Sequence, residues 1–342
     1  MRAALGLVLL AGCGQSPPES TDPGTDGGSF VAIAEALPGA LLSVWGDTDG
    51  IIWTVGADAG DGPAVLRHDG ETWETLDTGS QGDLWWVWGD GVGTVWMTGQ
   101  HGRILSHDLA TGATTETAVA GPDYVVFGIW GASPTDIWAV ASDVSGEQAG
   151  KILHFDGLEW TDGAVVDRAG REGWSQPFKV WGTGPNDVHV VGTNTLAMHF
   201  DGAEWTTLPP PVADDRTTLF TVHGSAADHA VAVGGFGSAV SAHWDGSGWT
   251  DTSPSPDVFA PAFTGVFSHA EHGTVAVGNN GAIWWHGGGE WMRDTRPPAT
   301  SLDFHGAWID DDGGVWAAGG DLMQLAAGVL CYGEPTGSAG MR

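Results

Sequence analysis

A short phrase recurs along this chain at a nearly constant interval, and this regularity restricts the possible folds more than any other feature. The phrase "SVWG" at Ser43 returns as "WVWG", "GIWG" and "KVWG", and then three more times in altered form. The aligned residues, 41 to 51 positions apart, are Trp45, Trp88, Trp130, Trp181, His223, Phe267 and Trp308. Repeats of this length indicate one supersecondary unit per copy, with neighbouring copies packed side by side.

Each copy contains four β-prone runs separated by turn residues. The first phrase is followed by an apolar run such as "IIWTVG", then by a run ending in Asp-Gly such as "KILHFDG", and then by a Trp. Asp-Gly favours tight hairpins, because Gly adopts positive φ and Asp hydrogen-bonds to the local backbone. Four strands in each of seven copies predict an all-β fold, a seven-bladed β-propeller with four-stranded antiparallel blades.

The composition agrees with this fold and argues against one class of partner. The 342 residues include 56 Gly and 20 Trp, which is typical of many short strands joined by frequent turns. We expect the Trp residues at repeat positions to lie chiefly in the core between blades. Lys and Arg number 11 against 43 Asp and Glu, so a phosphate backbone would be repelled and no nucleic-acid partner is expected.

The first 28 residues read as a leader and a tether. Residues 1–12 combine one charge with a short apolar run, which predicts a secretory signal peptide. The ending Leu-Ala-Gly before Cys13 resembles the bacterial lipobox, and this resemblance implies lipidation of Cys13. Residues 13–28 are rich in Pro, Gly, Ser, Thr and acidic residues, so we expect a lipidated flexible tether before a propeller over 29–342.

The repeats from residue 29 to about 333 resemble the Trp-rich, Asp-box-like propellers of bacterial lipoproteins. They are also distantly similar to BNR-repeat and photosystem II assembly-factor-like propellers. An Asp box proper carries a Ser or Thr two residues before its Asp and one residue between Asp and Gly, and "HFDGLEW" has neither. The resemblance therefore implies the architecture, and a sialidase activity is not expected.

The two ends of the propeller sequence predict how the ring closes. The seventh copy lacks the Asp-Gly-x-x-Trp ending, whereas "SFVAIAEAL" at 29–37 precedes the first copy like an outer strand without a blade. We predict that residues 29–37 form the outermost strand of the seventh blade, which removes an open edge. The alternative is a self-contained last blade in which residues 329–332 form that strand.

The connections between strands differ on the two faces of the predicted ring. First-to-second and third-to-fourth connections emerge on one face, the short-connection face. The others emerge on the long-connection face, where connections run over 161–177, 206–218 and 250–262. Variable loops on a repeated scaffold often carry function. The alternative is neutral variation of surface loops.

Basic residues and two exceptional positions favour the long-connection face as the binding face. The position two before the repeat aromatic is mostly small, but Trp86 and Lys179 occupy it in two copies. A basic rim in an acidic protein would attract an acidic ligand. The predicted partner-binding residues are Trp86, Arg171, Trp174, Lys179 and Arg216, with Arg168 beside them. Alternatively, Lys179 pairs with Glu172 or Asp215, and Trp174 packs over a blade junction.

Neither a catalytic set nor a metal site is predicted. His154, His199 and His243 occupy one repeat position in separate blades, too far apart to share a metal ion. The turns at Asp47 and Asp310 contain carboxylates that calcium could use, but neither continues as a complete calcium loop. No cofactor is therefore expected, and calcium remains an alternative.

Together these features predict a membrane-tethered, monomeric, extracytoplasmic scaffold that binds or assembles a protein or glycan partner on the long-connection face. The expected location is the bacterial cell envelope, specifically the outer membrane. A binding protein is favoured over an enzyme. One alternative is a carbohydrate-active enzyme, a glycosidase or lyase, with acids in the long connections. The other is a calcium-dependent adhesion module.

Overall fold

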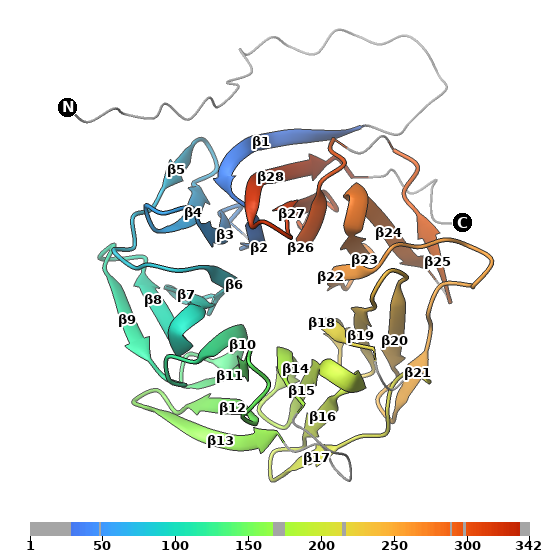
Figure 1. The fold of residues 1–342 in the computed structure, drawn as a ribbon, viewed down its shortest axis with the longest axis horizontal. Coiled ribbons are helices and arrows are strands. Elements are labelled where there is room, and N and C mark those ends of the chain that lie inside the picture. Colours follow the sequence, from blue (N-terminus) through green and yellow to red (C-terminus); the bar gives the residue numbers. More distant parts are fainter. Residues whose placement is uncertain are drawn as a thin grey trace, which may run out of the picture.

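The chain folds into a seven-bladed β-propeller, as the repeats predicted. A computed structural model describes residues 29–47, 49–166, 175–213, 217–287, 289–296 and 299–335. Seven four-stranded antiparallel sheets stand around one axis, and Figure 1 shows them in chain order around the ring. No helix in the described part of the chain is both long enough and apolar enough to cross a membrane.

Each blade runs from an inner strand at the axis to an outer strand at the perimeter. Blades 1 and 2 are β2 (Leu41–Gly46), β3 (Ile52–Asp58), β4 (Pro63–His68), β5 (Trp73–Thr75) and β6 (Leu84–Gly89), β7 (Thr94–Gly99), β8 (Arg103–Asp108), β9 (Thr114–Ala118). Blades 3 and 4 are β10 (Tyr124–Ser133), β11 (Asp136–Asp143), β12 (Gly150–Phe155), β13 (Trp160–Val166) and β14 (Pro177–Gly184), β15 (Asp187–Gly192), β16 (Ala197–Phe200), β17 (Trp205–Thr207).

The remaining blades follow the same order. Blades 5 and 6 are β18 (Leu219–Ala226), β19 (His229–Gly234), β20 (Val240–Trp244), β21 (Trp249–Asp251) and β22 (Phe263–His269), β23 (Gly273–Gly278), β24 (Ala282–Gly287), β25 (Glu290–Arg293). Blade 7 consists of β26 (Asp303–Ile309), β27 (Val315–Asp321), β28 (Ala326–Gly333) and, from the other end of the chain, β1 (Phe30–Gly39).

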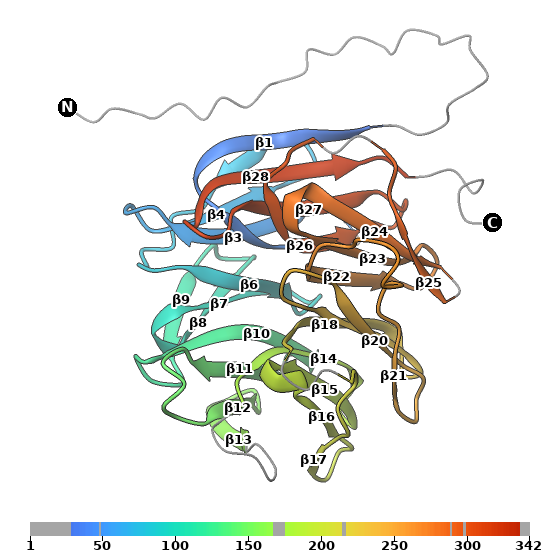
Figure 2. The same ribbon diagram turned by 45° about the vertical axis from the view of Figure 1, so that its right-hand side comes forward.

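This last pairing confirms the predicted closure. β1 pairs antiparallel with β28, from Phe30 opposite Gly333 to Gly39 opposite Ala326, and Figure 2 shows the two strands side by side. Residues 329–332 lie within β28, the third strand of the blade, so the alternative of a self-contained last blade is wrong. The strand from the N-terminal end covers an edge that would otherwise expose unpaired backbone groups.

The hydrophobic core is divided among the junctions between neighbouring blades. At one junction Trp53 and Val55 of β3 pack with Leu84 and Val87 of β6, and all four are buried. Sheets that are covered on both faces read as nearly continuous apolar runs, which explains sequences such as "AVAVG" on the second strands. The stacked blades thus hold the inner strands in fixed positions around the axis.

Candidate functional site

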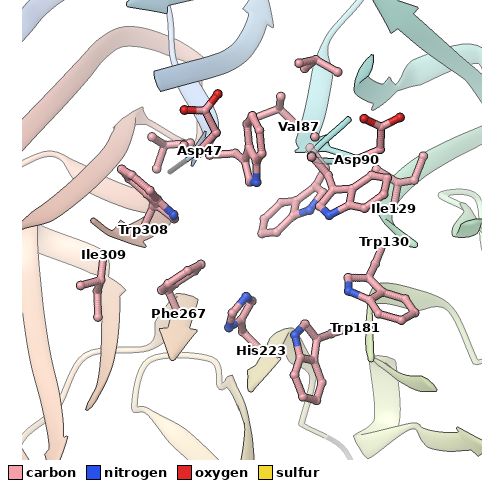
Figure 3. Close-up of a pocket in the computed structure, with 18 of the residues that line it drawn as sticks. Asp47, Val87, Asp90, Ile129, Trp130, Trp181, His223, Phe267, Trp308 and Ile309 are labelled. Carbon is pink, nitrogen blue, oxygen red and sulfur yellow. The ribbon is translucent and has the colours of Figure 1, made fainter. Parts of the chain in front are cut away.

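A central cavity of about 620 Å³ lies at the axis of the ring, and all seven inner strands contribute to its wall. Figure 3 shows its lining residues pointing inward from different blades. The rim includes Asp47, Asp49, Asp90 and Asp311, which belong to first-to-second strand connections. The cavity therefore opens on the short-connection face.

The wall of the cavity is a ring of seven repeat-position side chains: Trp45, Trp88, Trp130, Trp181, His223, Phe267 and Trp308. Five of the seven are Trp, and each Trp packs over the Gly that follows the repeat position in the next blade. Trp45, for example, lies over Gly89, where an added Cβ would come within 3.0 Å of the indole ring. The same holds for Gly46, Gly131, Gly182 and Gly224.

At the two remaining junctions a larger residue replaces the Gly and a smaller ring replaces the Trp. We call this relation between the two side chains of a junction the size rule. Blades 6 and 7 carry Ser268 and Ile309 where the other blades have Gly, and the preceding blades supply the smaller rings His223 and Phe267. The backbone N–H of Ser268 donates to Nδ1 of His223 at 3.1 Å. Burial lowers the pKa of His223 to about 3, so this ring is neutral at physiological pH.

The rim of the cavity is acidic. Oδ1 of Asp47 accepts hydrogen bonds from Asp49 and Ile51, and Oδ1 of Asp90 accepts from Val92, Gly93 and Thr94. Within the described residues, Oδ2 of neither carboxylate accepts a hydrogen bond. Figure 3 shows both groups at the edge of the aromatic ring. Aromatic walls below a rim of carboxylates suit a ligand that is cationic at one end.

Below this ring, every inner strand carries a β-bulge at the residue three before the repeat position. The register shifts fall at Leu42, Trp85, Phe127, Phe178, Phe220, Thr264 and His305. A bulge redirects the side chain of the extra residue. Ring centroids of Phe127 lie 5.1 Å from Trp85 and 5.0 Å from Phe178, so these aromatics meet one another across blades. We call the seven bulge residues the collar. The collar lies toward the long-connection face.

Bulges also leave backbone carbonyls outside the strand pairing, and side chains of other blades bind them. Thr221 Oγ1 donates to Thr264 O at 2.8 Å, and His305 Nδ1 donates to Leu42 O at 2.6 Å. Burial, and then the nearby charge of Lys179, lower the pKa of His305 to about 4. The collar is thus held by hydrogen bonds between blades as well as by ring packing.

Lys179 belongs to this system of hydrogen bonds between blades. Its side chain is only 3% exposed, its Nζ donates to the bulge carbonyl of Phe127 at 2.6 Å, and it lies 4.2 Å from the ring centroid of Trp86. Gly128 leaves room for it, because an added Cβ would lie 3.3 Å from Lys179 Cδ. Burial lowers the pKa of Lys179 to about 7.

The residues predicted from sequence as a partner surface are therefore spread over different environments. Trp86 lines the cavity that opens on the short-connection face. Lys179 is buried beneath it, so a partner cannot reach its ammonium group in this conformation. Cys13, Arg171, Trp174 and Arg216 lie outside the described residues, as do Arg168, Glu172 and Asp215. Their predicted roles stay predictions.

Blade 4 contains a cluster that the sequence reasoning missed. Oδ1 of Asp187 lies 3.1 Å from Nε2 of His189 and 2.8 Å from Nε2 of His199. Burial alone would raise the pKa of Asp187, but hydrogen bonds from His189, Thr183 and His199 hold it well below its usual range. Burial lowers the pKa of His189. The available signal was His189 itself, which replaces the Trp found at this strand position in four other blades.

The two turns considered for calcium use their carboxylates locally. Asp310 accepts from the backbone of Asp312 and Gly314 with Oδ1 and from the indole of Trp316 with Oδ2. Asp47 caps its own turn in the same way with Oδ1. Both residues therefore have a structural role in their turns, and calcium binding at either one stays a prediction.

Comparisons with known proteins agree with the fold. Neither a protein-family model nor a curated protein sequence matches the chain. Virginiamycin B lyase from Staphylococcus aureus superposes with a TM-score of 0.69 at 13% identity, over 89% of this chain and 99% of the lyase. YCF48 from Cyanidioschyzon merolae superposes with a TM-score of 0.66 at 13% identity, over 90% of this chain and 99% of the YCF48 chain. The structure of YCF48 bound to D1 peptide superposes with a TM-score of 0.56 at 15% identity, over 87% of this chain and 85% of the YCF48 chain.

These similarities define the class of protein. The chain is a seven-bladed β-propeller, and the expected likeness to photosystem II assembly-factor propellers is confirmed at the level of fold. The structural neighbours include YCF48, which has been solved with a D1 peptide bound, and a lyase. Identities of 11–15% extend no further than the architecture.

Proposed function

We propose that this protein is a membrane-tethered, extracytoplasmic scaffold that binds a protein partner in its central cavity. The observation that carries the proposal is the ring of seven repeat-position side chains below a rim of carboxylates. The partner chemistry that fits is a loop or terminal segment with a Lys or Arg side chain. Its cation would be attracted by the rim and its apolar stem would pack on the indole rings.

Two further points support a peptide-like ligand. A cavity of about 620 Å³ accommodates a few side chains of one segment. A propeller of similar fold, YCF48, has been solved with a D1 peptide bound. A protein with a formal charge of −32 also attracts basic segments over a long range at low ionic strength.

Photo-crosslinking tests the position of the partner. A photoreactive amino acid at Val92, which is 74% exposed on the cavity rim, should crosslink a protein in intact cells. Combining it with Asp47→Asn and Asp90→Asn should reduce the yield at least about fivefold, since two of the four rim carboxylates lose their charge while the turn hydrogen bonds remain possible. Asp201→Asn is the matched control, because Asp201 caps an outer turn through Ala203 and Glu204.

The long-connection face is the second candidate surface, and one observation favours it. Phe236 is 71% exposed on a second-to-third strand connection, and its ring lies 5.6 Å from that of Phe220 in the collar. A crosslinker at Phe236 therefore samples this face. Crosslinks at Phe236 with none at Val92 would place the partner there and overturn the cavity as the binding site.

The membrane tether is a separate part of the proposal and rests on the sequence around Cys13. If Cys13 is lipidated, Cys13→Ser should move the protein from the membrane fraction to the soluble extract. Partitioning is measured by fractionation and immunoblotting, with the adjacent change Gly14→Ser as control. Unchanged membrane partitioning of the Cys13 variant would rule out this anchor while leaving the cavity proposal intact.

A further inference from the structure

The cluster in blade 4 brings three metal-ligating groups together on rigid elements. Asp187 begins β15, His189 lies two residues further on the same strand, and His199 is its direct cross-strand partner on β16. One ligand atom from each residue lies within 4.8 Å of the other two. The three groups come from adjacent strands of one blade, so no movement between blades is needed to assemble them.

The ligand atoms lie close to the spacing that a metal site requires. Tetrahedral zinc with bonds of about 2.0–2.1 Å places its ligand atoms about 3.3 Å apart. Oδ1 of Asp187 lies 2.8 and 3.1 Å from the two Nε2 atoms, so each of these two pairs would separate by a few tenths of an ångström around the ion, and all three ligand atoms already lie within 4.8 Å of one another. Thr183 Oγ1 donates to Oδ2 of Asp187 at 2.5 Å, which orients the carboxylate from its other oxygen.

Packing fixes the two imidazole rings. His189 is 1% exposed. Its ring centroid lies 4.5 Å from that of His199, 4.8 Å from that of Trp244 and 5.8 Å from that of Trp249. Asp187 and the His199 side chain each remain about one-fifth exposed, so an ion can enter from solvent. Among the described residues, none hydrogen-bonds the buried Nδ1 of His189, whereas Nε2 faces Asp187 and is the nitrogen that an ion beside Asp187 would contact.

Blade 3 provides an internal comparison. Asp136 and His154 form the equivalent pair, with 2.7 Å between Oδ1 and Nε2, but the third position is Trp138. Trp53, Trp96 and Trp316 occupy the same place opposite the repeat aromatic in blades 1, 2 and 7. Only blade 4 therefore has the third ligand among these five blades.

We propose that Asp187, His189 and His199 bind one transition-metal ion of the Zn²⁺ class, with a fourth position open to water or a ligand. Two imidazoles and one carboxylate suit borderline divalent ions, whereas Ca²⁺ and Mg²⁺ prefer sets of oxygen ligands. The site lies beside the central cavity, because the ring of Trp181, which lines that cavity, stacks on His189 at 6.3 Å.

Metal binding to the tag-free full chain tests this site. Equilibrium dialysis with Zn²⁺ should show one tight site, and Co²⁺ should produce the intense visible absorption of tetrahedral coordination. His189→Trp, the residue of four other blades, and His199→Ser, the residue at Ser106 in blade 2, should each weaken binding at least about 100-fold. His154→Ala in blade 3 should bind as the wild type does, and Ca²⁺ should not compete.

Two variants keep the test decisive if one fails to fold. Circular dichroism and thermal melting check each variant without metal, and the partly exposed His199 is the safer position. Wild-type stoichiometry and Co²⁺ absorption in folded His199→Ser would overturn the proposal. A Co²⁺ spectrum with the wild type that is identical to that of the free hydrated ion would overturn it as well and leave the trio as a hydrogen-bonded cluster.

Discussion

Five of the seven junctions between neighbouring blades place a Trp over a Gly at the cavity wall, whereas the two junctions that join blades 5, 6 and 7 do not. At these two junctions, His223 faces Ser268 and Phe267 packs near Ile309. A larger residue in one blade thus accompanies a smaller ring in the blade before it. The side chains of the inner ring are therefore matched in volume at each junction separately, and its aromatic residues have a structural role as well as being candidate ligand contacts.

The largest expected loss of stability comes from opening the ring, because the junctions between blades exist only while the ring is closed. Deletion of residues 29–37 removes most of β1, including the buried side chains Phe30 and Leu37, and exposes the edge of β28. We expect the melting temperature to fall by roughly 10 °C or more. Deletion of residues 14–28 is the control and should leave it unchanged. Equal melting temperatures for the two deletions would contradict the closure.

The next effect tests the size rule directly. At Gly89, whose close neighbours are atoms of Trp45, the change Gly89→Ser should destabilise the protein by about 2–3 kcal/mol through overpacking. Adding Trp45→His recreates the pair found between blades 5 and 6, and should recover at least half of the loss. Denaturant unfolding of the single and double variants measures the coupling. Simple additivity of the two changes would disprove the rule.

A pH-dependent effect of comparable size is expected one layer below, where the Lys179 side chain lies against Gly128. The pKa of Lys179 is about 7 in the folded protein and 10.5 as the ordinary value, so the unfolded chain binds more protons between these pH values. Stability should therefore rise from pH 7 to pH 9.5, by up to about 1.4 kcal/mol per pH unit. In Lys179→Met this rise should be lost.

Lys151 provides the matched control for that experiment. Its Nζ also donates to a carbonyl, Ala120 O at 3.1 Å, and lies 4.7 Å from the ring of Tyr124. Unlike Lys179 it is not fully buried. The variant Lys151→Met should keep the rise in stability between pH 7 and 9.5, measured by denaturant midpoints. An identical pH profile for wild type and Lys179→Met would show that the buried amine is not the source.

The smallest effect is expected at an exceptional junction. Ser268→Gly gives blade 6 the residue of the other junctions but leaves the smaller His223 ring beside it. The change loses the hydrogen bond between Ser268 Oγ and Thr274 Oγ1 at 2.8 Å, so a cost of about 1 kcal/mol is expected in thermal unfolding. Combining it with His223→Trp should then be tolerated. A loss above about 3 kcal/mol in the double variant would limit the size rule to the Trp-Gly junctions.

The sequence alone determined the number of blades, the order of their strands and the closure by residues 29–37. These features are periodic or local: the repeat fixes the phase of each strand, and the missing ending of the seventh copy shows which strand is absent. The unusual positions of Trp86 and Lys179 were also visible, because a repeat makes every exception stand out. The sequence did not show which residues surround these two side chains.

Which side chains contact one another follows from the three-dimensional packing of the blades and not from the repeat itself. The cavity wall joins residues from Trp45 to Trp308, and its opening on the short-connection face depends on how seven strands converge at one axis. Lys179 is buried because Gly128 of the neighbouring blade leaves space for it and Phe127 offers a carbonyl. The repeat aligns His199 with His154 and His243 of other blades, yet its neighbour in space is His189 on the adjacent strand. Sequence periodicity specifies each blade, whereas contacts across strands and blades arise from packing in three dimensions.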